Sequence, residues 1–348
     1  MMNFNAGAWR PANNDARPMS AADDLVRRTL AQHGLMPDGA GLPGLTGLPG
    51  ADIARPAPTI PDGALFSRDT HAGHSGSRAY RTYVPASAGQ GIKGIVTMLH
   101  GCTQTPEDFA TGTGMNALAE QHNLIVIYPE QARGANAQTC WNWFSKGDQR
   151  RDRGEPEIIA GMTKRAMAEH GVPRTQTFVA GLSAGAAMAV ILGETYPDIF
   201  AAVGAHSGLP FGAASDVPSA FAAMAGTAGA ATGRLKPSDM RTIVFHGTAD
   251  RTVHPANGDT IADMAEASSI AASVRTTQTG QAGGRGYRRA IASGPEGDVR
   301  LEHWTVEGLG HAWSGGQPGG SYADPAGPDA SAEMIRFFMN INSQEILK

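Results

Sequence analysis

The sequence predicts an α/β fold built on one doubly wound, mostly parallel sheet with helices on both faces. From about residue 63 onward, segments with strand character alternate with helical segments, which is typical of strands joined by crossover helices. Several strand candidates are nearly continuous apolar runs, as expected of parallel strands that are covered on both faces. One α/β domain of about 280 residues therefore accounts for most of the chain, a size at which such folds often stay undivided.

The expected elements follow each other in regular order along this domain. The segments with strand character are 77–85, 94–101, 124–130, 175–181, 200–208, 241–247 and 299–308. Helices are expected at 114–123, at 157–171, directly after Ser183 and at 329–342. The Ala/Gly-rich stretch at 212–234 fits either a short helix or an irregular excursion.

The chain before this domain has a different character. Residues 20–34 predict a short amphipathic helix in which Leu25, Val26 and Leu30 share one face. The next stretch is rich in Gly and Pro with a few Gly-centred triplets, too few for a collagen triple helix, so we expect a flexible linker. We therefore divide the chain into an N-terminal helical segment at 1–35, a linker at 36–62 and an α/β catalytic domain at 63–348.

Composition argues against several classes of function. The net charge is −4 and no run of Lys or Arg occurs, so a nucleic-acid partner is not expected. No apolar run approaches the roughly 18 residues of a membrane span. Neither an HExxH pair nor a Cys/His cluster is present, so we expect no metal and no cofactor. The two cysteines, Cys102 and Cys140, fit either reduced core thiols or one disulfide.

The stretch Gly181-Leu182-Ser183-Ala184-Gly185 fits the pattern G-x-S-x-G. A strand candidate precedes it and a helix candidate follows, which is the context that a nucleophilic serine on a sharp strand-to-helix turn requires. The alternative is a serine that only caps the helix N-terminus. We expect Ser183 to be the nucleophile, because the partners that such a serine requires also occur.

A serine hydroxyl needs a base to remove its proton and an acid to orient that base. Asp250 follows the strand candidate 241–247, and His311 lies on a Gly-rich loop after the last strand candidate. Their order after the serine matches that of serine hydrolases with a strand-to-helix elbow. Asp259 is the weaker candidate for the acid. The other histidines of this region, His246, His254 and His303, are expected to be structural.

The reaction also requires two donors for an oxyanion. One is expected to be the N–H of Ala184, directly after the nucleophile. The second is expected from the loop after 94–99, where Gly101 lets the backbone turn inward and the Cys102 N–H is the candidate donor. The alternative for this second segment is a plain loop at the end of a strand.

Five ordered stretches carry a resemblance to a known family. LHGCTQTPEDF, CWNWF, GLSAGAAMA, HGTADRTVHPANG and GLGHAWSGG together resemble the poly(3-hydroxybutyrate) depolymerase family of esterases, over roughly residues 64–342. Feruloyl and acetylxylan esterases of carbohydrate esterase family one share much of this pattern. The resemblance implies an α/β-hydrolase fold, a triad of Ser183, Asp250 and His311, and oxyanion donors at Cys102 and Ala184.

The resemblance also suggests a disulfide between Cys102 and Cys140 and a place for aromatic residues. Such a bridge would tie Trp141 and Trp143 to the oxyanion loop, where they could wall an acyl pocket; the alternative is ordinary core packing. Trp313, two residues after His311, is expected to contact substrate. The family and the implied disulfide suggest an extracellular or periplasmic protein, whereas no signal peptide is readable at the N-terminus.

The function expected from these residues is hydrolysis of short-chain hydroxyacyl esters through an acyl-enzyme, with an ester or polyester as the substrate. A feruloyl or acetylxylan esterase is the close alternative, because only pocket contacts distinguish them. An acyltransferase would need a site that excludes water, and no lid is recognisable. A non-catalytic binding protein would normally lack a triad member, and none is missing here.

Overall fold

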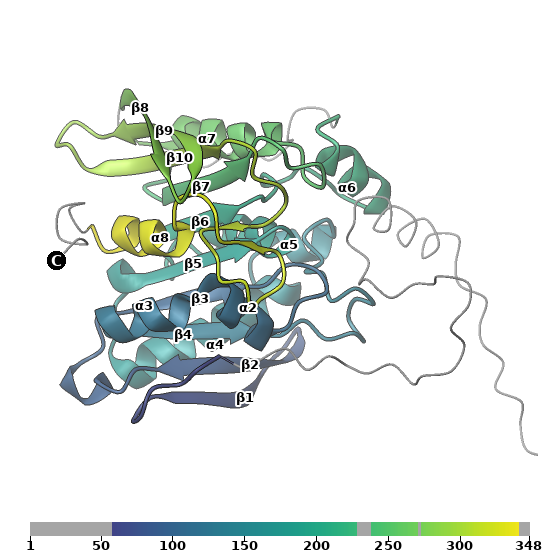
Figure 1. Ribbon diagram of the computed structural model, residues 1–348. Helices are drawn as coiled ribbons and strands as arrows, with labels where there is room; N and C mark the ends of the chain where they lie inside the picture. Colours follow the sequence, from purple (N-terminus) through teal and green to yellow (C-terminus); the bar gives the residue numbers. More distant parts are fainter. Residues whose placement is uncertain (1–57, 228–237, 271–272, 341–348) are drawn as a thin grey trace, which may run out of the picture. The chain divides into compact units, whose positions relative to one another are not determined.

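The computed structural model describes residues 58–227, 238–270 and 273–340, all within the compact unit Gly50–Lys348. The helix expected at 20–34 and most of the expected linker lie outside the described residues. A ten-stranded sheet forms the centre of the unit, in the order β1-β2-β4-β3-β5-β6-β7-β10-β9-β8 (Figure 1). A separate pair of short strands, β11 and β12, follows the large sheet in the chain.

The strands from β4 to β10 in this order are parallel to one another, whereas β1, β2, β8 and β9 add antiparallel edges. The bounds of the strands are β1 Leu65–Gly73, β2 Gly76–Val84, β3 Gly94–Leu99, β4 Leu124–Pro129, β5 Thr177–Leu182, β6 Ala202–His206, β7 Arg241–Gly247, β8 Val274–Ala282, β9 Arg285–Ser293, β10 Val299–Val306, β11 Trp313–Ser314 and β12 Ala323–Asp324. The predicted α/β fold with a mostly parallel sheet is confirmed.

Helices cover both faces of the sheet, as predicted (Figure 1). One apolar core joins the sheet to α2, α3 and α8, and further cores join its other face to α4, α5 and α7. The bounds of the helices are α2 Pro106–Thr113, α3 Met115–His122, α4 Gly154–His170, α5 Ala184–Thr195, α6 Val217–Met224, α7 Ala256–Ser268 and α8 Ala330–Phe338, with 3₁₀ turns η1 Ala88–Gln90, η2 Lys146–Gln149 and η3 Arg174–Gln176.

The central strands are buried along their whole length, which explains their uninterrupted apolar sequences. Every residue of β3, β4, β5 and β6 is buried. Parallel strands that are covered by helices on both faces have no solvent-facing side, so their residues need not alternate. These strands hold the segments that follow them at one edge of the sheet, where the candidate catalytic residues lie.

The sequence did not predict the edges of the sheet. β1 and β8 are exposed along most of their length, and β8, with the sequence VRTTQTGQA, has neither an apolar run nor a buried face. Hydrophobic periodicity cannot mark such strands, because their pairing is determined by β2 and β9. In the Ala/Gly-rich stretch 212–234, the structure has a short helix, α6, which was one of the two alternatives left open. Residues 228–237 lie outside the described part.

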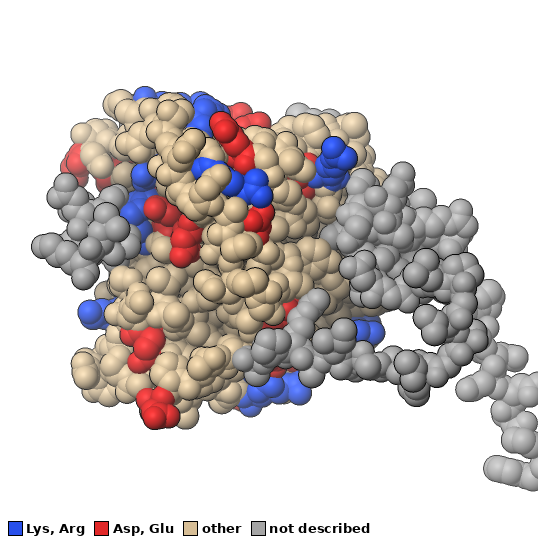
Figure 2. Space-filling view, in the orientation of Figure 1, with Lys and Arg blue, Asp and Glu red and all other residues tan. Residues whose placement is uncertain are grey.

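Charged side chains of both signs are scattered over the face in Figure 2, with no large area of a single sign. This distribution agrees with the small net charge of −4. Among the described residues, no helix is long and apolar enough to cross a membrane. The same residues contain no group of three or more His, Cys, Asp or Glu placed to hold a metal ion.

Candidate active site

Ser183 lies on a strained turn between β5 and α5. Its backbone has φ 58° and ψ −120°, a region that residues other than glycine rarely occupy. The Ser183 N–H donates to the carbonyl of His206 at the end of β6 (2.9 Å), which ties the turn to the neighbouring strand. The Ser183 side chain makes no capping hydrogen bond to α5, so the alternative of a helix cap does not describe it.

Two glycines make this turn possible by allowing backbones to approach closely. A Cβ on Gly181 would lie 2.5 Å from the carbonyl carbon and oxygen of Gly185. A Cβ on Gly185 would lie 2.1 Å from the carbonyl oxygen of Leu99, at the end of β3. Since real Cβ atoms never approach so closely, both positions of the G-x-S-x-G pattern require glycine for steric reasons.

Asp250 and His311 are joined by a hydrogen bond of 2.8 Å between Asp250 Oδ2 and His311 Nδ1. The other carboxylate oxygen accepts the backbone N–H groups of Thr252 and Val253, each at 2.9 Å. Burial acts to raise the pKa of Asp250, but His311 and the hydrogen bonds from His246 and His311 outweigh it and hold the pKa well below its usual value. An ionised Asp250 keeps the proton of a neutral His311 on Nδ1 and leaves Nε2 free to accept one.

The sheet topology brings the three segments to the same edge. Ser183 follows β5, Asp250 follows β7 and His311 follows β10, and these strands belong to the parallel run β5-β6-β7-β10. The carboxyl ends of parallel strands lie at one edge of a sheet, where α/β proteins bind their ligands. The residues that the sequence singled out therefore gather at this edge.

The other candidates of this region lie elsewhere or support the loops. Asp259 is 3.8 Å from His303 and belongs to α7, away from His311. His246 Nε2 donates to the carbonyl of Val253 (2.9 Å), and His254 Nδ1 accepts the N–H of Ala256 (3.2 Å). These contacts agree with the structural roles expected for these histidines.

The loop after β3 lies directly beside the nucleophile turn. A Cβ on Gly101 would lie 3.7 Å from the Cβ of Ser183. The Cys102 N–H has no acceptor among the described residues, and Ala184, as the first residue of α5, has an N–H that the helix itself leaves unpaired. Both expected donors thus belong to segments beside Ser183, and they stay the candidates for the oxyanion donors.

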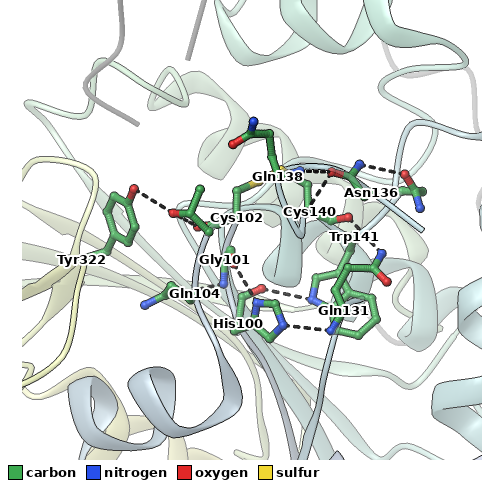
Figure 3. The surroundings of a disulfide bond; sticks show 12 residues. His100, Gly101, Cys102, Gln104, Gln131, Asn136, Gln138, Cys140, Trp141 and Tyr322 are labelled. Atoms are coloured by element: carbon green, nitrogen blue, oxygen red, sulfur yellow. Dashed lines mark hydrogen bonds between the residues drawn. A yellow bond between two sulfur atoms is a disulfide. The ribbon is translucent and has the colours of Figure 1, made fainter. Parts of the chain in front are cut away.

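A disulfide joins Cys102 to Cys140, as the family resemblance suggested (Figure 3). It connects the loop after β3 to the segment that follows β4. The Thr103 N–H donates to the carbonyl of Gln138 (2.8 Å), and the Gln131 side chain donates to the carbonyl of Cys140 (3.0 Å). The Thr103–Gln138 hydrogen bond therefore joins the two loops in addition to the covalent bond, whereas the Gln131 contact lies within the segment after β4.

The three tryptophans expected to contact substrate are in the core. Trp313 is 1% exposed; its indole N–H donates to Ser331 Oγ (3.0 Å), and its ring lies against His206 and Phe109. Trp141 is fully buried and donates to the carbonyl of His100 (3.1 Å), and Trp143 is 5% exposed. Their burial within two apolar clusters favours ordinary core packing over a substrate contact.

The sequence did not single out His206, which supports both sides of the site. Its carbonyl accepts the Ser183 N–H, and its Nε2 accepts the N–H of Ser314 (3.0 Å), three residues after His311. Burial lowers the pKa of His206 to about 3, with His246 and His311 adding to the effect, so the ring is neutral. Nothing in the sequence indicated this role, because His206 lies in an apolar strand and both of its partners, Ser183 and Ser314, are distant in the sequence.

Comparison with known proteins identifies the family. The sequence model of the family described as "Esterase PHB depolymerase" matches residues 78–285. The chain belongs to this esterase family. The match contains Ser183 and Asp250 but ends before His311, whose place is given by the structure alone.

Curated relatives of this family member include both polyester and carbohydrate esterases. Poly(3-hydroxyalkanoate) depolymerase C of Paucimonas lemoignei is 32% identical over 230 residues, which is 62% of this chain and 54% of that protein. Poly(3-hydroxybutyrate) depolymerase of Ralstonia pickettii is 30% identical over 76% of this chain and 58% of its own length. Acetylxylan esterase A of Talaromyces purpureogenus is 32% identical over 53% of this chain and 51% of its own length. The chain thus spans little more than half the length of these relatives.

The fold agrees with that of a solved esterase. The acetyl xylan esterase from Aspergillus awamori superposes with a TM-score of 0.59 at 20% identity, over 78% of this chain and 98% of that one. Together with the strand order and the turn at Ser183, this likeness establishes the α/β-hydrolase fold for this member of the esterase PHB depolymerase family.

Proposed function

We propose that this protein is a serine carboxylic ester hydrolase that acts on short-chain hydroxyacyl esters, in the manner of the poly(3-hydroxybutyrate) depolymerases, through Ser183, His311 and Asp250. The observation that carries the proposal is the 2.8 Å hydrogen bond between His311 and Asp250 at the sheet edge that holds the strained turn of Ser183. Family membership supports it, because its curated relatives are named as ester hydrolases.

The proposed first step forms an acyl-enzyme. His311 Nε2 takes the hydroxyl proton while Ser183 Oγ bonds to the ester carbonyl carbon, and the carbonyl π electrons move to the oxygen. The N–H groups of Cys102 and Ala184 stabilise that oxyanion. When the carbonyl re-forms, the bond to the alcohol oxygen breaks and the alcohol leaves with the proton held by His311.

The second step releases the acid. His311 removes a proton from water, the hydroxide oxygen bonds to the acyl carbon, and the resulting tetrahedral intermediate expels Ser183 Oγ, which recovers its proton from His311. The ionised Asp250 stabilises the imidazolium during both steps. The atoms and charges balance with the ester, one water molecule and the residues of this chain.

The decisive test is hydrolysis of p-nitrophenyl butyrate by the wild-type protein and by Ser183→Ala. We expect hydrolysis by the wild type and a loss of at least 1,000-fold in kcat for the variant, in the range known for nucleophile deletion (about 10⁶-fold in the best-studied case). Ser215→Ala, on a serine of the segment before α6, is the matched control. Equal turnover by the wild type and Ser183→Ala would rule out the proposed nucleophile.

A second test concerns which acyl group the enzyme removes. Acetylxylan esterase is the second candidate, because the Talaromyces and Aspergillus proteins carry that name. A parallel assay of 3-hydroxybutyrate oligomers, a polyhydroxybutyrate film, acetylated xylan and methyl ferulate separates the candidates. We expect the highest kcat/KM on the 3-hydroxybutyrate oligomers. A higher value on acetylated xylan or methyl ferulate would assign the site to a plant-polysaccharide ester instead.

A further inference from the structure

The side chain of Gln104 connects two loops of the candidate site. It lies two residues after Cys102 and is 3% exposed. Its Oε1 accepts the N–H of Gly101 (2.8 Å), and its Nε2 donates to the carbonyl of Ser321 (2.9 Å). Because a backbone N–H only donates and a backbone carbonyl only accepts, this pair of contacts fixes which end of the carboxamide is oxygen.

The two ends of this contact belong to the two halves of the site. Gly101 precedes the proposed oxyanion donor, and Ser321 lies in the loop between β11 and β12 that follows His311. A second contact joins the same loops, since Tyr322 OH is 3.2 Å from Thr103 Oγ1 and the Tyr322 ring packs edge-on against His311. Gln104 is therefore a direct bridge between the oxyanion loop and the loop of the proposed base.

Two contacts of His100 determine the direction of the Cys102 N–H. His100 Nδ1 donates to the carbonyl of Gly101 (2.7 Å), and His100 Nε2 accepts the N–H of Gln131 (3.2 Å), which fixes the tautomer (Figure 3). Burial lowers the pKa of His100 to about 4, so the ring is neutral. In a planar trans peptide the Cys102 N–H points opposite to the Gly101 carbonyl, so it faces away from His100.

We propose that Gln104 is a positioning residue for the reaction. By linking the Gly101 N–H to the Ser321 carbonyl in the loop that follows His311, it places the Cys102 N–H at the distance from Ser183 that the oxyanion requires. The inference rests on the proposed ester hydrolysis and adds a residue to it. Because Gln104 already accepts the Gly101 N–H, the Cys102 N–H is the one backbone donor of this dipeptide left for the oxyanion. The effect is expected in the transition state, where the oxyanion exists, and not in substrate binding.

Gln104→Glu and Gln104→Met test the proposal on the full chain. Glutamate keeps the shape but as a carboxylate cannot donate to the Ser321 carbonyl, and methionine keeps the length but forms neither contact. We expect kcat on p-nitrophenyl butyrate to fall by about 10- to 100-fold, less than the loss of a whole donor, with KM within about 2-fold of the wild type. The Ki of butane boronic acid, whose serine adduct is a tetrahedral anion, should rise by the same factor as kcat falls.

Asn123→Asp is the matched control for a buried carboxamide. Asn123 is 8% exposed, donates to the carbonyl of Gly91 and accepts from Ser87 Oγ (2.9 Å). It directly precedes β4, at the opposite end of the parallel strands from the site. We expect this exchange to lower the melting temperature while leaving kcat per active site and the boronate Ki unchanged.

Active-site titration with a p-nitrophenyl phosphonate reports the concentration of functional enzyme and separates positioning from misfolding. The positioning role is overturned if both Gln104 variants keep the wild-type boronate Ki, or if their loss of rate is explained entirely by a lower concentration of active sites. The proposed function is judged separately, by whether wild-type turnover depends on Ser183. An enzyme with Ser183-dependent hydrolysis and an unchanged boronate Ki in the Gln104 variants would keep the function and lose only the inference.

Discussion

The turn at Ser183 (residues 181–185) and the loop after β3 that carries the proposed oxyanion donor (residues 100–104) lie side by side, yet they are stabilised in different ways. The turn at Ser183 is held by backbone packing: glycines at 181 and 185 allow close approach to β3, and one backbone hydrogen bond ties the turn to β6. The loop after β3 is held by buried side chains and by the disulfide from Cys102 to Cys140. The first arrangement is local and steric, and the second depends on contacts with distant segments.

The difference teaches how each region should respond to change. A steric arrangement is highly sensitive to one added atom, because that atom can be accommodated only by moving backbone. An arrangement of several hydrogen bonds and one covalent bond weakens in steps, because the remaining contacts still hold the loop. We therefore expect all-or-none effects at the turn and graded effects at the oxyanion loop.

Gly185→Ala should have the largest effect on the folded structure, because the new Cβ would lie 2.1 Å from the Leu99 carbonyl oxygen. Either the chain does not fold, or β3 and α5 separate and activity falls below about one thousandth of the wild-type value, as for the loss of a well-placed catalytic group. Gly89→Ala in η1 is the control, since nothing lies within 4 Å of its added Cβ. Soluble yield, melting temperature and p-nitrophenyl butyrate turnover would be measured for both. Near-normal activity in Gly185→Ala would contradict the steric account.

Asp250→Asn should lower kcat by about 10,000-fold, as in other serine hydrolases with this arrangement. The amide oxygen can still accept the N–H groups of Thr252 and Val253, which turns the amide nitrogen toward His311 Nδ1. His311 must then place its proton on Nε2 and can no longer act as a base. Asp259→Asn is the matched control and should keep wild-type turnover, because the Asp259 side chain is 61% exposed. A small loss at Asp250 together with a large one at Asp259 would reverse the assignment of the acid.

The same difference explains which parts could be predicted from the sequence. The turn at Ser183 has a contiguous signature, because its steric demands fall on residues within two positions of the serine. Asp250 and His311 could be chosen as candidates through the order of elements, since each follows a recognisable buried strand. His206 and Gln104 were missed because their partners, Ser314 and Ser321, are more than 100 residues away. The burial of the three tryptophans could not be predicted, because a motif indicates proximity to the site but not which way a ring faces.

Removal of the disulfide by Cys102→Ser with Cys140→Ser should produce a graded effect. The bridge closes a loop with a sequence separation of 38, for which chain entropy predicts a loss of about 4 kcal/mol in the free energy of unfolding. We expect kcat to fall only about 10-fold, less than for loss of a whole donor, because His100 and Gln104 still hold Gly101. Denaturation curves and p-nitrophenyl butyrate kinetics measure the two effects. A loss of activity as complete as in Gly185→Ala would show that the disulfide alone positions the loop.

The smallest expected effect is on the pH dependence of stability. Each region is hydrogen-bonded to a buried neutral histidine, the turn at Ser183 to His206 and the loop after β3 to His100. Burial lowers the pKa of His100 to about 4 and that of His206 to about 3, and His303 in β10 is lowered to about 4 in the same way. In the unfolded chain each would titrate near 6.5, so below that pH the unfolded state binds more protons than the folded state. Stability contributed by these groups is therefore complete above about pH 6.5 and is lost as the pH falls toward about 4.

His303→Gln isolates one of these contributions without touching either region of the site. Over the range from about pH 6 to 5, the slope of the unfolding free energy against pH should be smaller in the variant by about 1 kcal/mol per pH unit. The difference between the two proteins is the quantity to measure, because burial raises the pKa of Glu155 and of Asp329, and these carboxyls oppose the histidines in the total slope. Urea denaturation at several pH values gives both slopes. Parallel slopes would mean that His303 takes up its proton without unfolding. The same measurement would then be needed at His100 and His206. Proton uptake by folded His100 would remove the fixed tautomer on which the loop after β3 depends.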